Sequence, residues 1–388
     1  MELIGWLVHF DTTSTNSNRP LIDGIANYLD LRRVPVELID SADGSKVNLI
    51  ATIGPSDAKS ILVSGHTDVV PADGDAWETD PFVVSVRDGR LYGRGTADMK
   101  SFIGLTLAIL APLHSVLSKK SVTLALSFDE EIGCRGAPLM LPHLAARRER
   151  LVGCVVGEPT EMRVGTAHKG KVAVRATVTG RSGHSAYPQL GSNAIDAAAE
   201  LITWLRKRAE REQREGRRDA RFDPPYATIQ TGVVAGGTSV NIIPEQCWFD
   251  FEIRSLPGQQ STGLIEELER HFRNGLPDYL NNQPNVPQLT VERISEYPPL
   301  LERNHVFVDW ARSLACSNED PITLSFGSEA GLFSSLGIPT VVCGPGSIHR
   351  AHIPNEYIEL EQLLDGARFL ENLGRQVREG LPAMAGAR

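Results

Sequence analysis

Histidines and carboxylates follow apolar segments of this sequence at several widely separated places. Four segments that indicate buried strands, ILVSG, LALSF, VGCVVG and IPTVVCG, each lead within a few residues to imidazole or carboxylate side chains. A fifth segment, LYGRGTADMK, carries an aspartate after a glycine-rich turn and at the start of a predicted helix. The side chains concerned are His66, Asp68, Asp98, Asp129, Glu130, Glu131, Glu158, His349 and His352.

A metal site is the chemistry that this set of side chains favours. Neighbouring carboxylates are costly to bury unless water, basic groups or a metal faces them. Imidazole with carboxylate and no thiolate suits Zn²⁺, Co²⁺ or Mn²⁺. The set exceeds the needs of one catalytic ion and suits two ions about 3.5–4 Å apart that share a carboxylate. Taken singly, such a histidine is often structural and such an acid often caps a helix, so the joint placement carries the prediction.

The elements that must position these residues alternate between strand and helix patterns, which predicts an α/β sheet. In such a sheet, ligands bind beyond the carboxyl ends of the strands, where these side chains fall. The predicted elements of this part are helices at 21–31 and 102–117 and strands at 60–64, 122–128 and 152–156.

A second domain is indicated by a change of pattern near Lys171. The segment KVAVRATVTGRSG alternates apolar and polar residues, as a strand with one solvated face does. Helices at 193–208 and 261–274 and strands at 228–234 and 247–255 are predicted next, and α/β patterns resume through 330–336 and 338–343. We therefore predict an α+β domain over 174–286, inserted into a discontinuous α/β domain of 1–173 and 287–388.

Composition places the chain among ordinary soluble globular proteins. It has 388 residues, of which 41% are hydrophobic and 22% charged, and its net charge of −9 disfavours nucleic acid or an anionic membrane as a partner. No apolar run is long enough to span a membrane, and the first residues lack a basic signal-peptide region. Five widely spaced cysteines without a CxxC motif indicate reduced, mostly buried thiols. The expected location is the cytoplasm.

Six ordered motifs also resemble a known family: SGHTDVVP, YGRGTADMKS, DEEIGCRG, GEPT, GHSAYPQLGSNAI and GPGSIHRAHIPNEYI. Together they are similar to the M20 family of dinuclear metallopeptidases and deacylases over nearly the whole chain. The segments FGSEAGLF and GPGSI..AH.PNEY most resemble the branch that deacetylates N-acetylornithine in arginine biosynthesis. The resemblance implies a catalytic domain with a mixed, mostly parallel sheet flanked by helices, plus an inserted ferredoxin-like dimerisation or lid domain.

The resemblance also implies roles for the clustered residues. One of two divalent ions, Zn²⁺ or alternatively Co²⁺, would be held by His66, Asp98 and Glu158. The other would be held by Asp98, Glu131 and His352, with Asp98 shared. In the remaining roles, Asp68 would hydrogen-bond the second ring nitrogen of His66, Glu130 would be the general base, and Asp129 would have no assigned role. His349 competes with His352, but the spacing of HIPNEY favours His352.

Further residues are implied to contact the substrate. His184, in GHSAYP, would reach the active site of the partner subunit in a homodimer, although a turn-capping role explains the residue equally well by itself. Arg254 would bind a substrate carboxylate, but a surface ion pair is the simpler explanation from sequence alone. The other candidates are Asn241, Gly327 and Ser328 as pocket residues and Glu329 as the partner of a substrate cation or of an intramolecular group.

Hydrolysis of an N-acyl amino acid follows from these parts. A metal-activated water, deprotonated by Glu130, would attack the amide carbonyl. N-acetyl-L-ornithine is the leading substrate. N-succinyl-diaminopimelate, N-acetylcitrulline and the di- or carboxypeptide substrates of the family remain alternatives. A relative that binds substrate without catalysis is disfavoured, because every expected ligand and the base are present. An enzyme that uses a single ion is a further alternative.

Overall fold

The computed structural model describes residues 1–72, 76–259, 262–281 and 286–381. The chain divides into two compact units, Met1–His168 with Leu300–Arg388 and Lys169–Pro299. Within the described ranges, no helix is long and apolar enough to cross a membrane.

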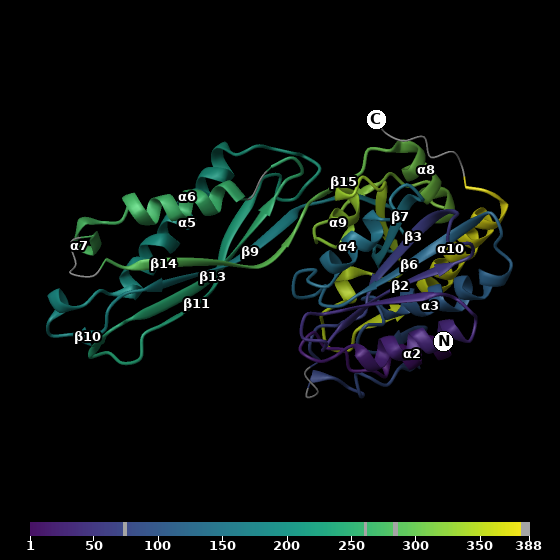
Figure 1. Cartoon of the computed structure of the whole chain (residues 1–388), viewed down its shortest axis with the longest axis horizontal. Coiled ribbons are helices and arrows are strands. Elements are labelled where there is room, and N and C mark those ends of the chain that lie inside the picture. The colour runs from purple at the N-terminus through teal and green to yellow at the C-terminus, as the bar shows by residue number, and fades with distance from the viewer. Residues whose placement is uncertain (73–75, 260–261, 282–285, 382–388) are drawn as a thin grey trace. The chain divides into compact units, whose positions relative to one another are not determined.

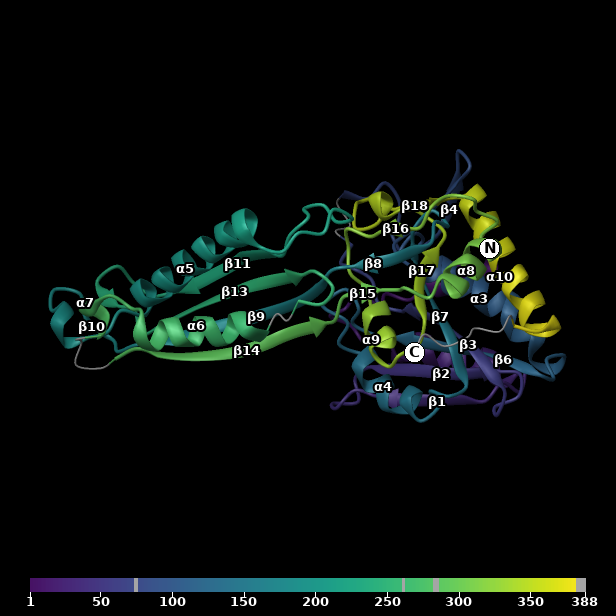
Figure 2. The ribbon, with the colours of Figure 1, turned by 90° about the horizontal axis from the view of Figure 1, so that it is seen from above.

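The larger unit is built on a nine-stranded sheet (Figures 1 and 2), with the path β1-β2-β6-β3-β7-β17-β8-β15. Its four central strands run parallel: β6 (Lys120–Ser127), β3 (Lys59–His66), β7 (Leu151–Pro159) and β17 (Thr340–Gly344). They are buried along almost their whole length, which explains their continuous apolar runs. The path is completed by antiparallel β1 (Val36–Asp40), β2 (Val47–Ile53), β8 (Gly165–His168) and β15 (Leu300–Leu301), and β16 (Ile322–Thr323) pairs with β8.

Helices flank this sheet (Figure 2), so the predicted α/β architecture is confirmed. The helices of the larger unit are α1 (Glu2–Val8), α2 (Arg19–Asp30), α3 (Lys100–Leu110), α4 (Ala137–Ala145), α8 (His305–Leu314), α9 (Ala330–Ser335) and α10 (Leu360–Glu379). The helix predicted over 102–117 ends earlier, at Leu110, and continues as a 3₁₀ turn over Ala111–Ser115. Pro112 explains the difference, because it has no N–H for the helical ladder and its ring clashes with the preceding turn.

A small three-stranded sheet was not anticipated from the sequence. Its strands are β4 (Ser85–Arg87), β5 (Arg90–Tyr92) and β18 (Tyr357–Glu359), in the order β18-β5-β4. Tyr357 pairs with Tyr92 across the two strands. The pairing brings the segment that precedes β18 beside the glycine-rich turn that follows β5, although the two are far apart in the sequence.

The second unit has the predicted ferredoxin-like arrangement. Along the chain it contains β9 (Gly170–Thr179), α5 (Ala194–Glu215), β11 (Thr228–Gly236), β13 (Gln246–Ser255), α6 (Thr262–Asn274) and β14 (Gln288–Tyr297), with the short elements β10 (Gly183–His184), β12 (Ile242–Ile243) and α7 (Asp278–Asn281) between them. The four long strands form an antiparallel sheet in the order β11-β13-β9-β14, whose alternate apolar residues pack with those of α5 and α6.

The boundaries of this unit differ from those predicted. A return to the larger domain was expected at 287, but Gln288–Tyr297 pairs with β9 along its whole length and therefore belongs to the second unit. The chain leaves the larger unit after His168, slightly before the expected 173. The start of the helix predicted from Ser261 lies outside the described residues. Pairing with β9 decides where the strand belongs.

All five cysteines are free. Cys316 is exposed, and the other four, Cys134, Cys154, Cys247 and Cys343, are buried. Burial raises the pKa of the Cys343 thiol to about 12, so this thiol stays protonated near neutral pH. The predicted reduced and mostly buried thiols are confirmed.

Candidate metal centre

The candidate centre lies where three adjacent parallel strands end. His66 is the last residue of β3, Glu158 is the next-to-last residue of β7, and Glu130 and Glu131 lie three and four residues after the end of β6. His66 is in register with Ser127, the last residue of β6. Since the carboxyl ends of parallel strands share one edge of the sheet, these side chains converge as the sequence predicted.

Two residues from loops complete the cluster. Asp98 precedes α3, and His352 lies in the loop between β17 and β18. Nε2 of His66 lies 2.8 Å from Oδ1 of Asp98, and Nε2 of His352 lies 3.1 Å from Oδ2 of the same carboxylate. Nε2 of His352 also lies 3.0 Å from Oε1 of Glu131. The two oxygens of Asp98 thus face two different imidazoles, as a carboxylate shared by two ions would.

Glu158 and Glu130 also lie close to His66. One ligand atom from each of His66, Glu130 and Glu158 lies within 4.8 Å of the others, and the same holds for His66, Asp98 and Glu131. Oε1 of Glu158 is buried, lies 3.9 Å from Nε2 of His66, and accepts no hydrogen bond from the described residues. A buried carboxylate oxygen without a donor among the described residues, beside the imidazole of His66, fits a divalent cation.

The electrostatics of the cluster also fit cations. Burial raises the pKa of Glu130 to about 8 and that of Glu131 to about 7, and it raises the pKa of Glu158 well above its ordinary value. Burial acts on Asp98 in the same direction, but hydrogen bonds with His352 and His66 outweigh it and hold the pKa of Asp98 below its usual range. Positive ions between these groups would favour the ionised carboxylates that serve as ligands.

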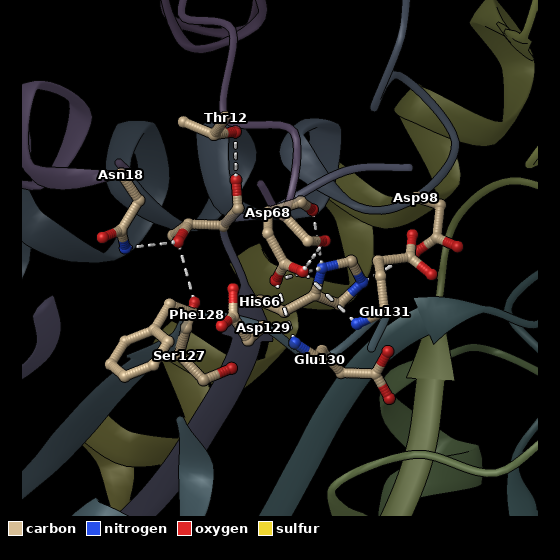
Figure 3. Close-up of polar contacts among 12 residues, drawn as sticks. Thr12, Asn18, His66, Asp68, Asp98, Ser127, Phe128, Asp129, Glu130 and Glu131 are labelled. Carbon is tan, nitrogen blue, oxygen red and sulfur yellow. Dashed lines mark hydrogen bonds and ion pairs between the residues drawn. The ribbon is translucent and has the colours of Figure 1, made fainter. Parts of the chain in front are cut away.

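Asp68 holds the loop that presents the two glutamates (Figure 3). Its carboxylate accepts hydrogen bonds from the main-chain N–H of Glu130 at 3.0 Å and of Glu131 at 3.3 Å. It also accepts the hydroxyl of Ser14 at 2.7 Å. The sequence assigned this carboxylate to Nδ1 of His66, but that nitrogen bonds the Asp68 main-chain carbonyl at 2.9 Å, while the carboxylate lies 3.6 Å away. The role implied for Asp68 is corrected accordingly.

Asp129 belongs to the support of this loop. It has a φ of 55° and forms an ion pair with Lys46, whose ammonium also bonds the carbonyl of Ser14. Asn48 spans the loop, accepting the Phe128 N–H at 3.1 Å and donating to the Gly136 carbonyl at 2.8 Å. Lys46, Ser14 and Asn48 could not be predicted as partners of this loop, because all three lie far from it along the chain.

His349 is exposed and lies in a separate cavity of about 170 Å³ with Glu161 and Ser347. His352 is the histidine that faces Asp98 and Glu131.

Glu329 and Ser328 lie inside the protein. The Glu329 carboxylate accepts the hydroxyls of Ser64 on β3 and Ser127 on β6, so its partners are intramolecular. Ser328 is fully buried, and its Oγ accepts the N–H of Ala330 at 3.2 Å, at the start of α9. The role of Ser328 as a pocket residue stays a prediction, because this hydrogen bond uses only an acceptor site of its hydroxyl. Gly327, beside it, is partly exposed.

The other predicted substrate residues belong to the second unit. His184 is exposed, its Nδ1 accepts the N–H of Ala186 at 3.0 Å, and it pairs with Ile242 in a two-stranded ribbon. Asn241 precedes Ile242, and its main-chain carbonyl accepts the N–H of Ser185 at 3.1 Å. The turn before β12 therefore brings His184 and Asn241 together. Arg254 lies in β13 and donates through Nε to Glu252 at 2.8 Å, an ion pair that the sequence left open.

Carboxylates and imidazoles gathered at the carboxyl edge of an α/β sheet, with an inserted ferredoxin-like unit, define a metal-dependent amidohydrolase. The family model of peptidase family M20/M25/M40 matches residues 62–376. The chain belongs to this family, as its motifs predicted.

Curated relatives are similar along nearly the whole chain. Acetylornithine deacetylase of Pasteurella multocida is 34% identical over 366 residues, which cover 93% of this chain and 91% of the relative. Acetylornithine deacetylase of Myxococcus xanthus is 35% identical over 364 residues, which cover 92% of each chain. This similarity places the chain among hydrolases that act on an amide.

Solved structures share the fold. An M20 family metallo-carboxypeptidase from Sulfolobus solfataricus matches with a TM-score of 0.74 at 18% identity, covering 98% of this chain and 99% of the other. A dinuclear metal-binding M20 peptidase from Bacillus subtilis matches with a TM-score of 0.64 at 16% identity, covering 97% and 98%. At these identities the similarity concerns the fold alone.

Proposed function

We propose that this protein hydrolyses N-acetyl-L-ornithine to L-ornithine and acetate, as a step of arginine biosynthesis. The similarity of at least 33% identity to three acetylornithine deacetylases, over at least 90% of this chain, carries the proposal. The complete set of ligands and base at the strand edge supports it.

Two divalent ions, Zn²⁺ or Co²⁺, are the proposed cofactors. His66, Asp98 and Glu158 would hold one, and Asp98, Glu131 and His352 the other. When bound, such ions supply Lewis acidity that lowers the pKa of water. Two observations fit this assignment. Oε1 of Glu158 has no hydrogen-bond donor among the described residues, and the two oxygens of Asp98 face two different imidazoles.

Glu130 is the proposed general base. It would take a proton from the attacking water and deliver it to the amide nitrogen as the carbon–nitrogen bond breaks, giving acetate and the free amine. Its main-chain N–H is fixed by Asp68, so the side chain extends from an anchored point. The thiol of Cys134 contacts Oε1 of Glu130 at 3.3 Å.

Arg254, Asn241 and His184 are the proposed substrate contacts from the second unit. The guanidinium of Arg254 would bind the α-carboxylate of the substrate, exchanging Glu252 for it. A proton on His184 would stabilise negative charge on the carbonyl oxygen during attack. Asn241 shares the turn with His184 and would contact the same end of the substrate.

A homodimer is the proposed assembly, with His184 acting in the site of the partner subunit. β11 is an edge strand of the sheet of the second unit. Its Val233 and Val234 are exposed, and so are Val240 in the turn that follows and Ile242 in β12. An unpaired strand edge with exposed aliphatic side chains suits pairing with a second copy.

The test is amine release by protein loaded with Zn²⁺ or Co²⁺, with a chelator control. N-acetyl-L-ornithine is run beside N-acetylcitrulline and N-succinyl-diaminopimelate. We expect fast, chelator-sensitive turnover of N-acetyl-L-ornithine. Preferential turnover of another substrate would keep the chemistry and reject the substrate, whereas no turnover of any would reject the proposed activity.

A further inference from the structure

A buried carboxylate outside the proposed ligand set holds the turn that carries Asp98. Glu356 is 1% exposed, and its two oxygens accept four hydrogen bonds. Oε2 accepts Nη1 of Arg94 at 2.7 Å and the main-chain N–H of Gly95 at 3.0 Å. Oε1 accepts the main-chain N–H groups of Ala97 at 2.8 Å and of Asp98 at 3.1 Å. Four donors on two oxygens require the ionised form of Glu356.

The loop that carries Glu356 also carries His352, a proposed ligand of the second ion. His352 lies four residues before Glu356 and faces Asp98 and Glu131. The main-chain carbonyl of Glu356 also accepts the N–H of Gly93 at 3.0 Å. Glu356 therefore fixes the Asp98 turn and the His352 loop to one another, through side chain and main chain together.

The two proposed ion sites depend on this connection to different degrees. His66 and Glu158 are residues of β3 and β7, which hydrogen-bonded neighbours in the sheet hold on both sides. His352 lies outside any strand, has a φ of 60°, and its side chain is 47% exposed. Its position relative to Asp98 thus depends on loop contacts, of which those of Glu356 are the most buried.

We propose that Glu356 is a positioning residue that sets the affinity of the ion held by Asp98, Glu131 and His352. It acts through the main-chain N–H of Asp98, and the ion held by His66, Asp98 and Glu158 depends on it less, because strands β3 and β7 hold two of the three ligands of that ion. The proposal rests on the two-ion site of the proposed function and deepens it.

The test is a calorimetric titration of metal-free protein with Zn²⁺, comparing wild type with Glu356→Gln. Glutamine keeps the shape but turns an NH₂ group toward N–H donors, which pushes the turn away. Wild type should bind two ions. The variant should bind one with wild-type affinity and the second about 10–100-fold more weakly, the usual effect of losing a group that orients a metal ligand. Glu356→Asp, which withdraws the oxygens by one methylene, should give a smaller loss and serves if the glutamine variant does not fold.

Glu302 provides the matched control. It too accepts main-chain N–H groups, those of Arg303 at 2.8 Å, Asn304 at 2.7 Å and Thr340 at 2.6 Å, and it lies near the start of β17, at the opposite end of that strand from the His352 loop. Glu302→Gln should lower the melting temperature yet leave both ions at wild-type affinity. Absorption of Co²⁺-loaded protein gives a second readout, because only the Glu356 variants should change the spectrum of the second ion.

The proposal would be overturned by equal weakening of both ions in Glu356→Gln, by an equal effect of Glu302→Gln, or by a wild-type protein that binds a single ion. Two ions in wild type without turnover of N-acetyl-L-ornithine would instead reject the proposed substrate and leave the role of Glu356 in place. Wild-type metal binding in Glu356→Gln beside normal turnover would reject the role of Glu356 alone.

Discussion

Nδ1 of His66 lies 2.9 Å from the main-chain carbonyl of Asp68, two residues further along the chain. A carbonyl oxygen only accepts, so Nδ1 carries a proton, and Nε2 is the nitrogen that faces Asp98 and would bind a metal. The main chain thereby selects the tautomer that a metal ligand needs. The carboxylate of Asp68 is left to bind the N–H groups of Glu130 and Glu131.

Asp68→Asn should therefore affect turnover more than metal binding. The carbonyl that orients His66 remains, whereas an amide in place of the carboxylate cannot accept all the donors that hold Glu130 and Glu131. We expect kcat to fall about 10–100-fold with both ions retained. Steady-state kinetics and metal content measure this, and a lost ion with unchanged kcat per bound site would contradict it.

Glu130→Gln should retain both ions and lose turnover. An amide cannot take the proton of the attacking water, and general base catalysis typically contributes about 10²–10⁴-fold. The measurement is kcat with N-acetyl-L-ornithine beside metal analysis. Asp129→Asn is the neighbouring control, since Asp129 pairs with Lys46 and should keep turnover near wild type. Near-normal turnover in Glu130→Gln would show that another group is the base.

His352→Ala and His349→Ala should differ in metal content. Only His352 contacts Asp98 and Glu131, so its loss should remove the ion that these three residues hold. His349 is exposed in a separate cavity, and its replacement should leave two ions bound. Metal analysis after gel filtration distinguishes the two, and the reverse pattern would assign the ligand to His349.

Metal-free protein should lose stability as the pH rises from about 5 to about 7. In the folded state the pKa of Glu130 is raised to about 8 and that of Glu131 to about 7, against ordinary values of 4.5. Within this window the unfolded chain releases protons that the folded chain retains, so the free energy of unfolding falls with rising pH. His352, whose pKa is raised to about 10, adds a loss in the same direction above its ordinary 6.5.

Most groups with the opposite effect lie outside that window, and His271, whose pKa is lowered by burial from its ordinary 6.5, offsets only part of the trend. The pKa of Lys100 is lowered to about 7 by burial, so its contribution changes only above that pH, and that of Asp98 changes only at or below its ordinary 3.8. Melting curves recorded with a chelator across this pH range measure the fall in stability, and Glu131→Gln should make that fall shallower. Bound Zn²⁺ should reverse it, because the metal competes with protons for the ligands. A metal-free protein that grew more stable toward pH 7 would contradict the prediction.

Arg254→Met should impair binding of substrate without changing metal content. Hydrogen bonds to charged groups contribute about 1.5–3 kcal/mol, which corresponds to about 10–100-fold in kcat/KM, mostly through KM. Arg175→Met is the control, because Arg175 forms a similar pair with Asp250 in the same sheet, with both distances at 2.8 Å. Equal effects of the two substitutions would indicate that Arg254 serves only the stability of the sheet.

The cluster of ligands was predictable from sequence because strand order and local position determine it. Parallel strands end at one edge, so His66, Glu131 and Glu158 had to converge once β3, β6 and β7 were identified from their continuous apolar runs. The alternation of apolar residues in β9 likewise indicated a sheet with one solvated face in the second unit. These inferences need only the spacing of apolar residues along the sequence and the direction of the strands.

Only the tertiary structure determined the contacts between distant segments, because no nearby sequence pattern predicts them. Nothing near Glu356 in the sequence marks it as the acceptor of four donors from residues 94–98, because those donors lie more than 250 residues earlier. Likewise, nothing in the sequence marks the hydroxyl of Ser328 as the acceptor of the Ala330 N–H at the start of α9. Hydrogen-bond partners of buried polar groups depend on which segments pack together, and that packing is a property of the whole fold.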